Sequence, residues 1–497
     1  MGPPHRSGFP DACVEELVPL PDPAECCERL DGLPYRLFLD SATPGPRLGR
    51  HSFVSADPAA IVRSRGASVE QIDLRSGARL HVTGDVLSAL RALLAPCRSD
   101  PIPGLPPFQG GAAGYVAYEW GHTLEQLPAP RHNDLELDDV VFGIYDWVIA
   151  WDHVEGRAWL ISTGIPETSP QGRARRADER AAEVRARLRT AAPAGPVHQT
   201  AHSRKAAAAA SYLLEDGWWD PRVPLRSSFT RAGYLEAVAR AREYVFAGDI
   251  FQVNLSQRFE APIEESPWQL YRRLRATNPA PFAAYLELPE AAVLSASPER
   301  FLHVDSAGRV ETRPIKGTRP RGAWPEDDAA LGRALTESPK DRAENLMIVD
   351  LMRNDLSRVC APGSVRVAEL FALEQYATVH HLVSTVVGRL APGADALDLL
   401  RAAFPGGSIT GAPKLRAMEI IHELEPSRRG VYCGSMGYWS RTGVFDANIA
   451  IRTAVARQGR VYFNAGGGIV ADSDPGQEYQ ETLDKARGII DALAVPA

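Results

Sequence analysis

The sequence predicts an α+β protein whose first half is rich in strands and whose second half mixes strands and helices. Three observations favour this fold class. Residues 35–165 alternate short apolar runs with turn residues, a pattern typical of strands. A stretch rich in Arg, Ala, Pro and Gly then separates this region from the remainder. Beyond that stretch, helical periodicity and extended runs follow one another to the end of the chain.

Composition limits the function classes. The 497 residues are 44% hydrophobic and 24% charged, which is ordinary for a soluble globular protein of two or three domain-sized units. A net charge of −7 argues against a nucleic-acid partner. No apolar stretch is long enough to span a membrane, so we expect no membrane association and a cytoplasmic location. The six cysteines form no C-x-x-C pair, which indicates free thiols rather than a zinc site or a disulfide framework.

The first region contains four clear strand candidates, at residues 35–39, 52–55, 140–145 and 147–151. Residues 171–189 are rich in Arg, Ala and Glu and predict a solvated helix. Residues 191–196 and 203–210 have the composition of a linker. We therefore divide the chain into a β-rich region at 1–165, a charged helix and linker at 166–228, and a domain of mixed strands and helices at 229–497.

Helix signals in the second half are local and specific. Thr230 is suited to cap a helix that ends at Gly248. Residues 340–351 read as a second helix, and Asp474 and Pro475 supply the cap and first turn of a third. The Gly-rich run at residues 404–414 leads into a fourth helix, whose expected inward residues are Leu415, Met418 and Leu424.

A carboxylate and an amine are expected to share one site. Glu299 and Lys316 lie on two strand-like runs joined by the turn at residues 305–308, and a simple hairpin would place them within roughly 8 Å of each other. The alternative from periodicity is an exposed cross-strand salt bridge. A nucleophilic Lys316 must be neutral, yet an ordinary lysine is only about 0.1% neutral at pH 7.5, so burial or positive neighbours must lower its pKa.

Two helices also offer pairs of acids at i,i+3 spacing: Asp341 with Glu344, and Glu478 with Glu481. Oxygen ligands without His or Cys favour Mg²⁺, although either pair alone is more often a solvated helix face. Because His380 and His381 are adjacent, only one of them is expected to enter a site.

The run Arg-Pro-Ile-Lys-Gly-Thr-Arg-Pro-Arg-Gly at residues 313–322 resembles the signature loop of the chorismate-utilising enzymes. The blocks at residues 341–356, 379–384, 404–419 and 465–486 match the same family in order. The Pro-Ile-Lys-Gly-Thr sequence is similar to the large (component I) subunits of aminodeoxychorismate synthase, whereas the sister anthranilate synthase component I typically has Ala in place of Lys316. The resemblance implies an anthranilate-synthase-like fold, with β-sheets forming a sandwich core and helices on the outside.

The resemblance also implies a reaction. We expect amination of chorismate at C4 to 4-amino-4-deoxychorismate, on the route to p-aminobenzoate and folate, through a covalent intermediate on Lys316 with Glu299 as the acid. No cysteine lies in a glutaminase-like nucleophile motif, so ammonia is expected from a separate glutamine amidotransferase subunit in a heterodimer. Gln252 stands where isochorismate-forming relatives carry a water-activating lysine, which argues against hydroxylation.

The family pattern suggests further site residues. Around a single Mg²⁺ it places Asp341, Glu344, Glu478 and Glu481, with Glu more usual where Asp341 stands. Its catalytic histidine aligns with His381. Its substrate contacts correspond to Gly317, Thr318, Tyr432, Arg452 and the glycines of the expected ligand-binding turn, Gly466, Gly467 and Gly468. Asp40 and Ser41 lie where related subunits form a tryptophan pocket, but Asp40 departs from the Glu of the feedback-inhibited pattern.

Two rival functions remain open from the sequence. Anthranilate synthase component I aminates chorismate at C2 and eliminates pyruvate, but Lys316 would obstruct that ammonia position. A non-catalytic regulator that binds tryptophan or chorismate belongs to a different class, and the presence of Glu299, Lys316 and all four acids argues against it.

Overall fold

The computed structural model describes residues 12–43, 45, 48–128, 132–190, 210–214, 217–220, 222–376 and 379–494, and the structural statements below refer to these residues. The linker expected at residues 191–196 and 203–210 lies outside them, apart from residue 210.

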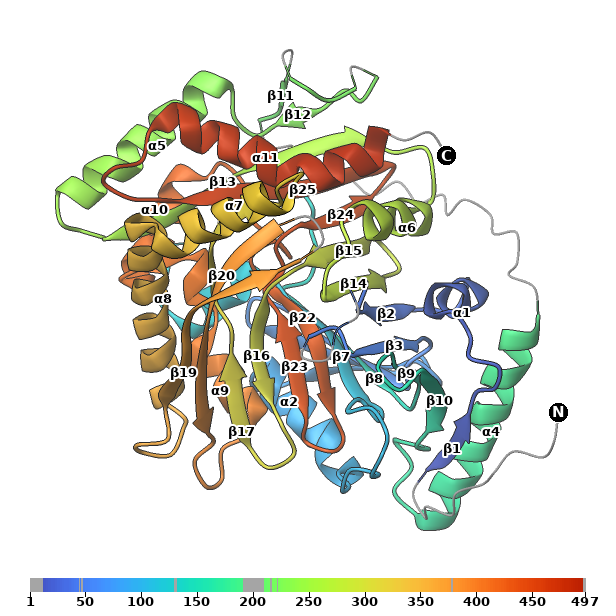
Figure 1. The fold of residues 1–497 in the computed structure, drawn as a ribbon. Helices are drawn as coiled ribbons and strands as arrows, with labels where there is room; N and C mark the ends of the chain where they lie inside the picture. The colour runs from blue at the N-terminus through green and yellow to red at the C-terminus, as the bar shows by residue number, and fades with distance from the viewer. Residues whose placement is uncertain are drawn as a thin grey trace.

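Two large antiparallel sheets form the centre of the molecule (Figure 1). In order across the sheet, the strands of the first are β1 (Cys13–Glu16), β10 (Arg157–Ser162), β9 (Trp147–Asp152), β3 (His51–Ser55), β2 (Leu37–Asp40), β14 (Phe282–Glu287), β15 (Ala292–Ser297), β24 (Thr453–Arg457), β25 (Arg460–Ile469), β13 (Gln252–Pro262), β12 (Arg226–Ser227) and β11 (Tyr212–Leu213), with β21 (Gly411–Ala412) paired to β13. Those of the second are β18 (Ile315–Pro320), β20 (Val379–Arg389), β17 (Arg309–Thr312), β16 (Arg300–Val304), β23 (Phe445–Asn448), β22 (Ser435–Ser440), β7 (Gly111–Val116), β8 (Val140–Tyr145), β4 (Ala60–Arg65), β5 (Ser68–Asp73) and β6 (Arg79–Val82), with β19 (Arg366–Gln375) paired to β20.

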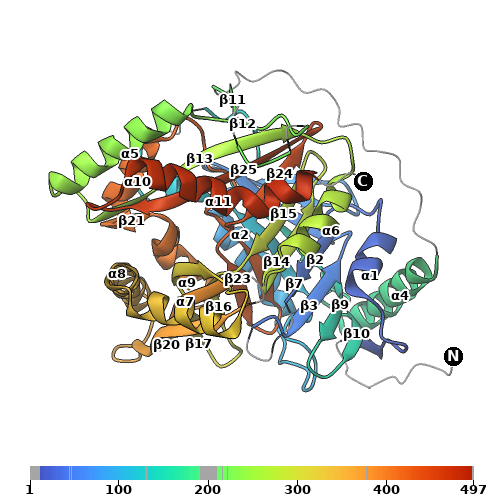
Figure 2. The same cartoon turned by 45° about the horizontal axis from the view of Figure 1, so that its top comes forward.

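Helices surround these sheets. They are α1 (Pro23–Arg29), α2 (Val86–Leu94), α3 (Gly121–Leu124), α4 (Pro170–Arg189), α5 (Arg231–Phe246), α6 (Pro267–Thr277), α7 (Pro325–Glu337), α8 (Pro339–Ser357), α9 (Ala396–Ala403), α10 (Lys414–Leu424) and α11 (Pro475–Ala494), with short 3₁₀ turns η1 (Ala95–Cys97), η2 (Tyr118–Trp120) and η3 (Gly407–Ile409). Helices α5 and α11 lie side by side across the top of the molecule, where α11 packs on β25 (Figure 2). Helix α8 packs against β20 and β18. The α+β class with sheets inside and helices outside is therefore confirmed.

Both sheets run through the first and second halves of the chain. Strand β2 pairs with β14, so that Asp40 lies opposite Ala283, and β7 pairs with β22, so that Tyr115 lies opposite Met436. The hydrophobic core is likewise built from residues of both halves. The described part of the segment 166–228 itself supplies β11 and β12 to the edge of the first sheet. The three-part division of the chain stays a prediction.

Local sequence signals placed most elements closely. Strand β8 has the predicted bounds, and β2, β3 and β9 begin and end within two residues of them. The Thr230 hydroxyl accepts a hydrogen bond from the Gly233 backbone N–H at 3.0 Å, and Gly248 has a φ of +81° just beyond the end of α5. On α10, Met418 is buried as expected, but the expectation for Leu415 is wrong, because 44% of its surface is exposed.

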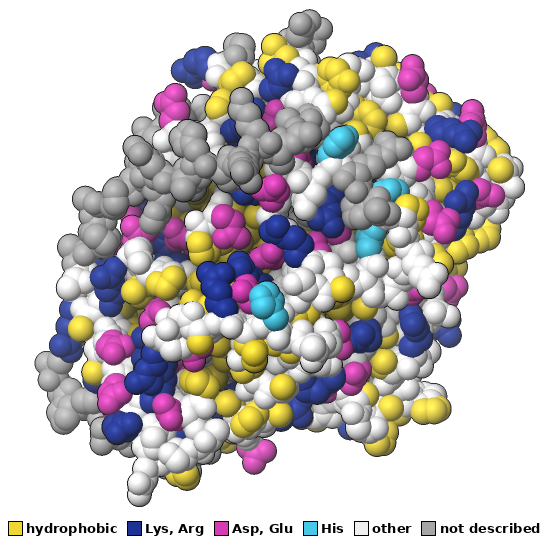
Figure 3. All heavy atoms as spheres, turned by 180° about the vertical axis from the view of Figure 1, so that it is seen from behind, with side chains coloured by type: hydrophobic (Ala, Val, Ile, Leu, Met, Phe, Trp, Pro, Cys, Tyr) yellow, Lys and Arg dark blue, Asp and Glu magenta, His cyan; other side chains and the backbone are white. Residues whose placement is uncertain are grey.

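Helix α4 was expected to be solvated, and only its outer face is. Ala177 and Ala181 are buried beneath it. Arg176 and Arg180 pair with the buried carboxylate of Asp146 at 2.8 and 3.2 Å. The arginines therefore fasten the helix to the sheet rather than forming a free basic surface. On the face of the molecule opposite to that of Figure 1, basic and acidic side chains are interspersed (Figure 3). In the part of the chain that the structure describes, no helix is long and apolar enough to cross a membrane.

Candidate active site

The strand that carries Lys316 does not form the hairpin predicted from the sequence. The turn at residues 305–308 does join β16 to β17, with His303 opposite Glu311. Lys316, however, lies beyond Pro314 on β18, which pairs with β20 instead of β16. The predicted simple hairpin between the strand-like runs of Glu299 and Lys316 was therefore wrong.

Glu299 and Lys316 nevertheless meet, and the loop before α10 brings them together. The Lys316 ammonium donates a hydrogen bond to the backbone oxygen of Ser408 at 2.8 Å. The Glu299 carboxylate accepts hydrogen bonds from the Ser408 side chain and from the backbone N–H of Ile315. Both reactive groups thus contact one residue, and Glu299 has only 4% of its surface exposed.

Burial moves the pKa values of both groups toward physiological pH. It raises the pKa of Glu299 to about 7, against the opposing effects of Ser408 and of the positive charge on Lys316. Burial lowers the pKa of Lys316, although the carboxylates of Glu344 and Glu299 favour its charged form. The pair can therefore supply an acid that holds a proton near neutral pH and an amine that gives one up more readily than an ordinary lysine.

His381 lies on β20 beside β18, and its neighbour His380 points elsewhere. The His381 Nδ1 atom is 2.9 Å from the Thr318 hydroxyl, whereas His380 Nε2 is 2.8 Å from Asp328 of α7. Burial and the positive charge of Arg452 lower the pKa of His381 to about 3, so its imidazole is neutral at physiological pH. The expectation that these two side chains diverge is confirmed, while the catalytic role of His381 stays a prediction.

Arg452 and Tyr432 are neighbours in the interior. Arg452 adopts a φ of +52°, unusual for a residue with a side chain, and burial lowers the pKa of its guanidinium. Tyr432 lies close enough to Arg452 for its charged form to favour the charged guanidinium. Burial raises the pKa of Tyr432 well above its ordinary value. A half-buried guanidinium beside a neutral phenol is chemically suited to hold a carboxylate.

The three consecutive glycines were predicted to follow a strand as a turn, but they lie within β25. Their residues pair with β13, with Gly467 opposite Leu255 and Gly468 opposite Asn254. The lack of side chains serves packing: a Cβ on Gly467 would lie 2.9 Å from Glu478 Oε2 and 3.2 Å from Glu481 Oε1. The strand therefore makes room for the two acids of α11.

The four predicted magnesium ligands lie on α8 and α11. Among the described residues, no three His, Cys, Asp or Glu side chains form a ready-made metal group. Asp341 instead pairs with Arg319 at 2.8 Å, Glu344 lies 3.9 Å from Lys340, and Glu481 lies 2.6 Å from Lys485.

The donor chemistry still fits a hard divalent cation. In the described part of the chain, Glu478 Oε2 is buried without a hydrogen-bond partner, and it lies with Glu481 Oε1 beside Gly467. Burial raises the pKa values of Glu344 and Glu478, and the negative charge of Glu481 raises both further. Carboxylates that repel one another around a buried oxygen lacking a partner are typical of a cation site.

A cavity of about 420 Å³ lies between the two sheets and includes Asp40 and Ser41 in its lining. The Asp40 carboxylate is already engaged, because Arg275 donates a hydrogen bond to it at 2.6 Å and Tyr271 donates another at 3.4 Å. The Ser41 hydroxyl donates to the backbone oxygen of His51 at 2.5 Å.

Sequence reasoning missed two residues of the site. Ser408 lies in the Gly-rich run at residues 404–414, but no pattern singled it out. Lys485 donates a hydrogen bond to the backbone oxygen of Gly466 at 2.8 Å and lies near both Lys316 and Glu299. Its place one helical turn after Glu481 was the available signal.

Comparison with known proteins agrees with this geometry. A family profile described as chorismate binding enzyme matches residues 37–491. Aminodeoxychorismate synthase component 1 of Klebsiella aerogenes is 44% identical over 476 residues, covering 95% of this chain and 97% of that protein. Anthranilate synthase component 1 of Streptomyces coelicolor is 45% identical over 413 residues, covering 82% and 78%. The crystal structure of anthranilate synthase component I from Streptococcus pneumoniae superposes with a TM-score of 0.73 at 31% identity, covering 90% of this chain and 93% of that one.

Proposed function

This chain belongs to the family of chorismate binding enzymes, and we propose from that membership that it is the chorismate-aminating component of an aminodeoxychorismate synthase. The reaction replaces the C4 hydroxyl of chorismate with an amino group and retains the enolpyruvyl group. One observation carries the proposal: the amine of the half-buried Lys316 and a buried carboxyl with a pKa of about 7 contact the same residue, Ser408. A nucleophile and an acid are therefore available together.

The steps use the two groups in turn. The neutral amine of Lys316 attacks C2, the two conjugated ring double bonds shift, and the C4 hydroxyl leaves as water with the proton of Glu299. The substituted lysine nitrogen then loses a proton. Ammonia adds at C4, the double bonds shift back, and Lys316 departs and is protonated, so the net reaction consumes chorismate and ammonia and yields 4-amino-4-deoxychorismate and water.

Substrate orientation is assigned to the buried cations and the acid cluster. Arg452 and Tyr432 hold one carboxylate of chorismate, with backbone groups of residues 466–468, Gly317 and Thr318 along the ring. His381 is held by Thr318 and remains neutral, so it serves as a hydrogen-bonding group. Asp341, Glu344, Glu478 and Glu481 would hold Mg²⁺, which when bound supplies positive charge for the other carboxylate. Because Asp341 pairs with Arg319, it is the member assigned to indirect contact.

Ammonia is supplied by a second subunit in this proposal, a glutamine amidotransferase in a heterodimer. Two observations support this second subunit. The relatives are named as component 1 of their enzyme, and none of the six cysteines in this sequence lies in a glutaminase nucleophile motif. The cavity that Asp40 and Ser41 help to line is of a size for tryptophan. Because Asp40 is neutralised by Arg275, we assign such a ligand a structural role rather than feedback inhibition.

Anthranilate synthase component I is the second candidate, favoured by the 45% identity to the Streptomyces coelicolor protein. It requires ammonia at C2, where the amine of Lys316 is directed in our assignment. A non-catalytic regulator would have no use for an acid and an amine buried together. Incubation with chorismate, Mg²⁺ and an ammonium salt separates the three, followed by product mass and pyruvate together. An aminated chorismate without pyruvate is expected; anthranilate with equimolar pyruvate, or binding without turnover, would refute the proposal.

A further inference from the structure

Ser408 contacts both reactive groups of the site through two different atoms. Its backbone oxygen accepts the hydrogen bond from Lys316, and its side chain bonds to the Glu299 carboxyl. Building on the proposed function, we propose that Ser408 is a positioning residue, whose hydroxyl orients the acid Glu299 while its carbonyl oxygen fixes the amine of Lys316. The residue itself undergoes no covalent change.

The loop that carries Ser408 is held by backbone hydrogen bonds on both sides. The Arg429 guanidinium donates to the backbone oxygen of Ile409 at 2.9 Å, and the Asn254 N–H donates to that of Thr410 at 2.7 Å. Within the loop, the Thr410 hydroxyl donates to the backbone oxygen of Gly406 at 3.0 Å. These hydrogen bonds hold the backbone of the loop, including the Ser408 carbonyl oxygen, in one position. The Lys316 amine therefore bonds to an oxygen atom that is held in place.

Packing fixes the same loop against the catalytic elements. A Cβ on Gly407 would lie 2.5 Å from a methyl group of Leu351 on α8, and one on Gly406 would lie 2.6 Å from Ile449. The ring of Phe404 lies 5.2 Å from that of Trp120, in η2. Such close contacts leave Ser408 little freedom, because displacement in either direction meets side chains.

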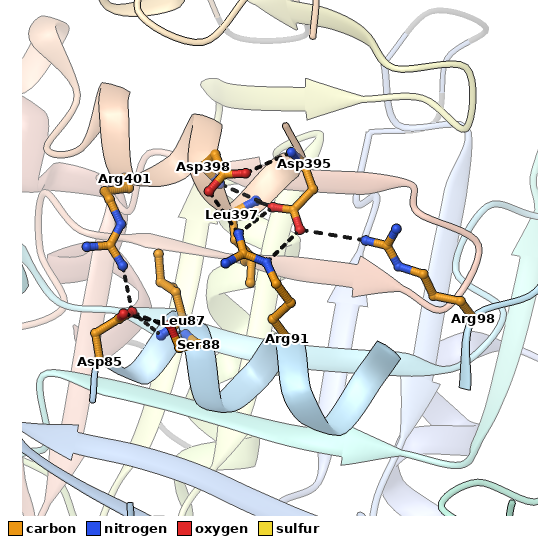
Figure 4. Close-up of polar contacts among 9 residues, drawn as sticks. All are labelled: Asp85, Leu87, Ser88, Arg91, Arg98, Asp395, Leu397, Asp398 and Arg401. Carbon is orange, nitrogen blue, oxygen red and sulfur yellow. Dashed lines mark hydrogen bonds and ion pairs between the residues drawn. The ribbon is translucent and has the colours of Figure 1, made fainter. Parts of the chain in front are cut away.

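An ion-pair network anchors the helix that leads into this loop (Figure 4). On α2, the Arg91 guanidinium bonds Asp395 at 2.8 Å and Asp398 at 2.9 Å, both at the start of α9. Arg401, in the last turn of α9, reaches back to Asp85 at 2.6 Å. The two ends of α9 are thus tied to α2, and its C-terminal end delivers the chain to Ser408 only a few residues later.

The contacts of Ser408 are suited to orienting a proton transfer. The Ser408 hydroxyl and the Ile315 N–H occupy lone pairs of the Glu299 carboxyl. The acidic proton of Glu299 must therefore lie on a part of the carboxyl group that accepts neither hydrogen bond. In the same way, an amine that donates one hydrogen to the Ser408 oxygen has a fixed lone-pair direction. One residue thereby sets the geometry of acid and nucleophile together.

The variant Ser408→Ala separates the two contacts, because it removes the hydroxyl and leaves the backbone oxygen. With ammonium as the nitrogen donor, we expect kcat to fall by about tenfold or more with KM changed less than about threefold. Since the hydroxyl stabilises the Glu299 carboxylate, its loss should also move the Glu299-dependent limb of the pH profile to higher pH. Ser408→Thr retains a hydroxyl and should restore both. Thr410→Val is the matched control, because it removes a hydroxyl that bonds only within the loop.

A kcat and pH profile that are unchanged in Ser408→Ala would overturn the assignment, as would an equal loss in Thr410→Val or a failure of Ser408→Thr to restore activity. A readout without turnover keeps the test independent of the proposed function. Infrared titration of the Glu299 carboxyl, identified by its loss in Glu299→Gln, should show a higher midpoint in Ser408→Ala than in the unmodified chain. If the unmodified chain yields anthranilate and pyruvate, the proposed function fails, while this comparison of Ser408 variants remains valid.

Discussion

The protonation of Glu299 should set the alkaline limb of the first chemical step. An ordinary glutamic acid with a pKa near 4.3 is only about 0.2% protonated at pH 7. Burial raises the pKa of Glu299 to about 7, so about half of the molecules carry the proton at that pH and about a tenth at pH 8. Because the neutral fraction of Lys316 rises over the same pH range, we expect the ratio of the adduct-formation rate of the unmodified chain to that of Glu299→Gln to fall as the pH rises through about 7, approaching tenfold per pH unit.

The assay is adduct formation without ammonia, followed by intact-protein mass spectrometry after mixing with chorismate and Mg²⁺. This design removes the protonation of ammonia from the pH profile. The Glu299→Gln variant lacks an acidic proton but keeps a similar shape, and it should form the adduct about 100-fold more slowly or worse, with the limb near pH 7 absent. The reasoning is refuted if this variant retains the same limb, or if the ratio of the two rates stays constant across that range.

Three further predictions concern the nucleophile, the acid cluster and the α2–α9 contact. Lys316→Ala should yield no adduct mass and no C4 amination, and an adduct of undiminished yield would exclude Lys316 as the nucleophile. Glu478→Gln should weaken Mg²⁺ binding by about tenfold or more in calorimetric titration, because it neutralises the buried oxygen that lacks a partner, and unchanged affinity would remove Glu478 from the cation site. Arg91→Ala should lower the stability by about 1 kcal/mol at low salt and less at high salt, since the side chain is 39% exposed and pairs with two carboxylates. Arg98→Ala is the control, because its guanidinium has one long ion pair of 3.7 Å to Asp395 and lies 5.5 Å from the Trp439 ring, and an equal loss of thermal stability there would argue against the network.

Local signals in the sequence were sufficient wherever the cause is local. The Thr230 cap, the strand at residues 140–145 and the start of α11 each depend on a few neighbouring residues, and the structure has them where expected. The divergence of His380 and His381 likewise follows from the alternation of side chains along one strand.

Long-range pairing could not be derived in the same way. The hairpin at residues 305–308 was correct, but nothing local reveals that β18 leaves β16 and pairs with β20. The three glycines suggested a turn because glycine permits one. In the structure, a side chain at Gly467 would clash with two carboxylates of α11, and one at Gly466 or Gly468 would clash with residues of β13. In both cases the deciding partner is more than ten residues away, beyond the reach of periodicity.

The meeting of Glu299 and Lys316 shows how much the site depends on such distant partners. The two residues are 17 positions apart, yet their common contact is Ser408, about ninety residues further along the chain. The position of Ser408 depends on α9, which α2 holds through Arg91, a residue from the first hundred of the sequence. Since both sheets also contain strands from the two halves, the N-terminal region forms part of the support of the active site. Removal of residues 1–165 should therefore abolish folding of the remainder rather than release an active catalytic domain, and a soluble, active fragment beginning near residue 229 would contradict this view.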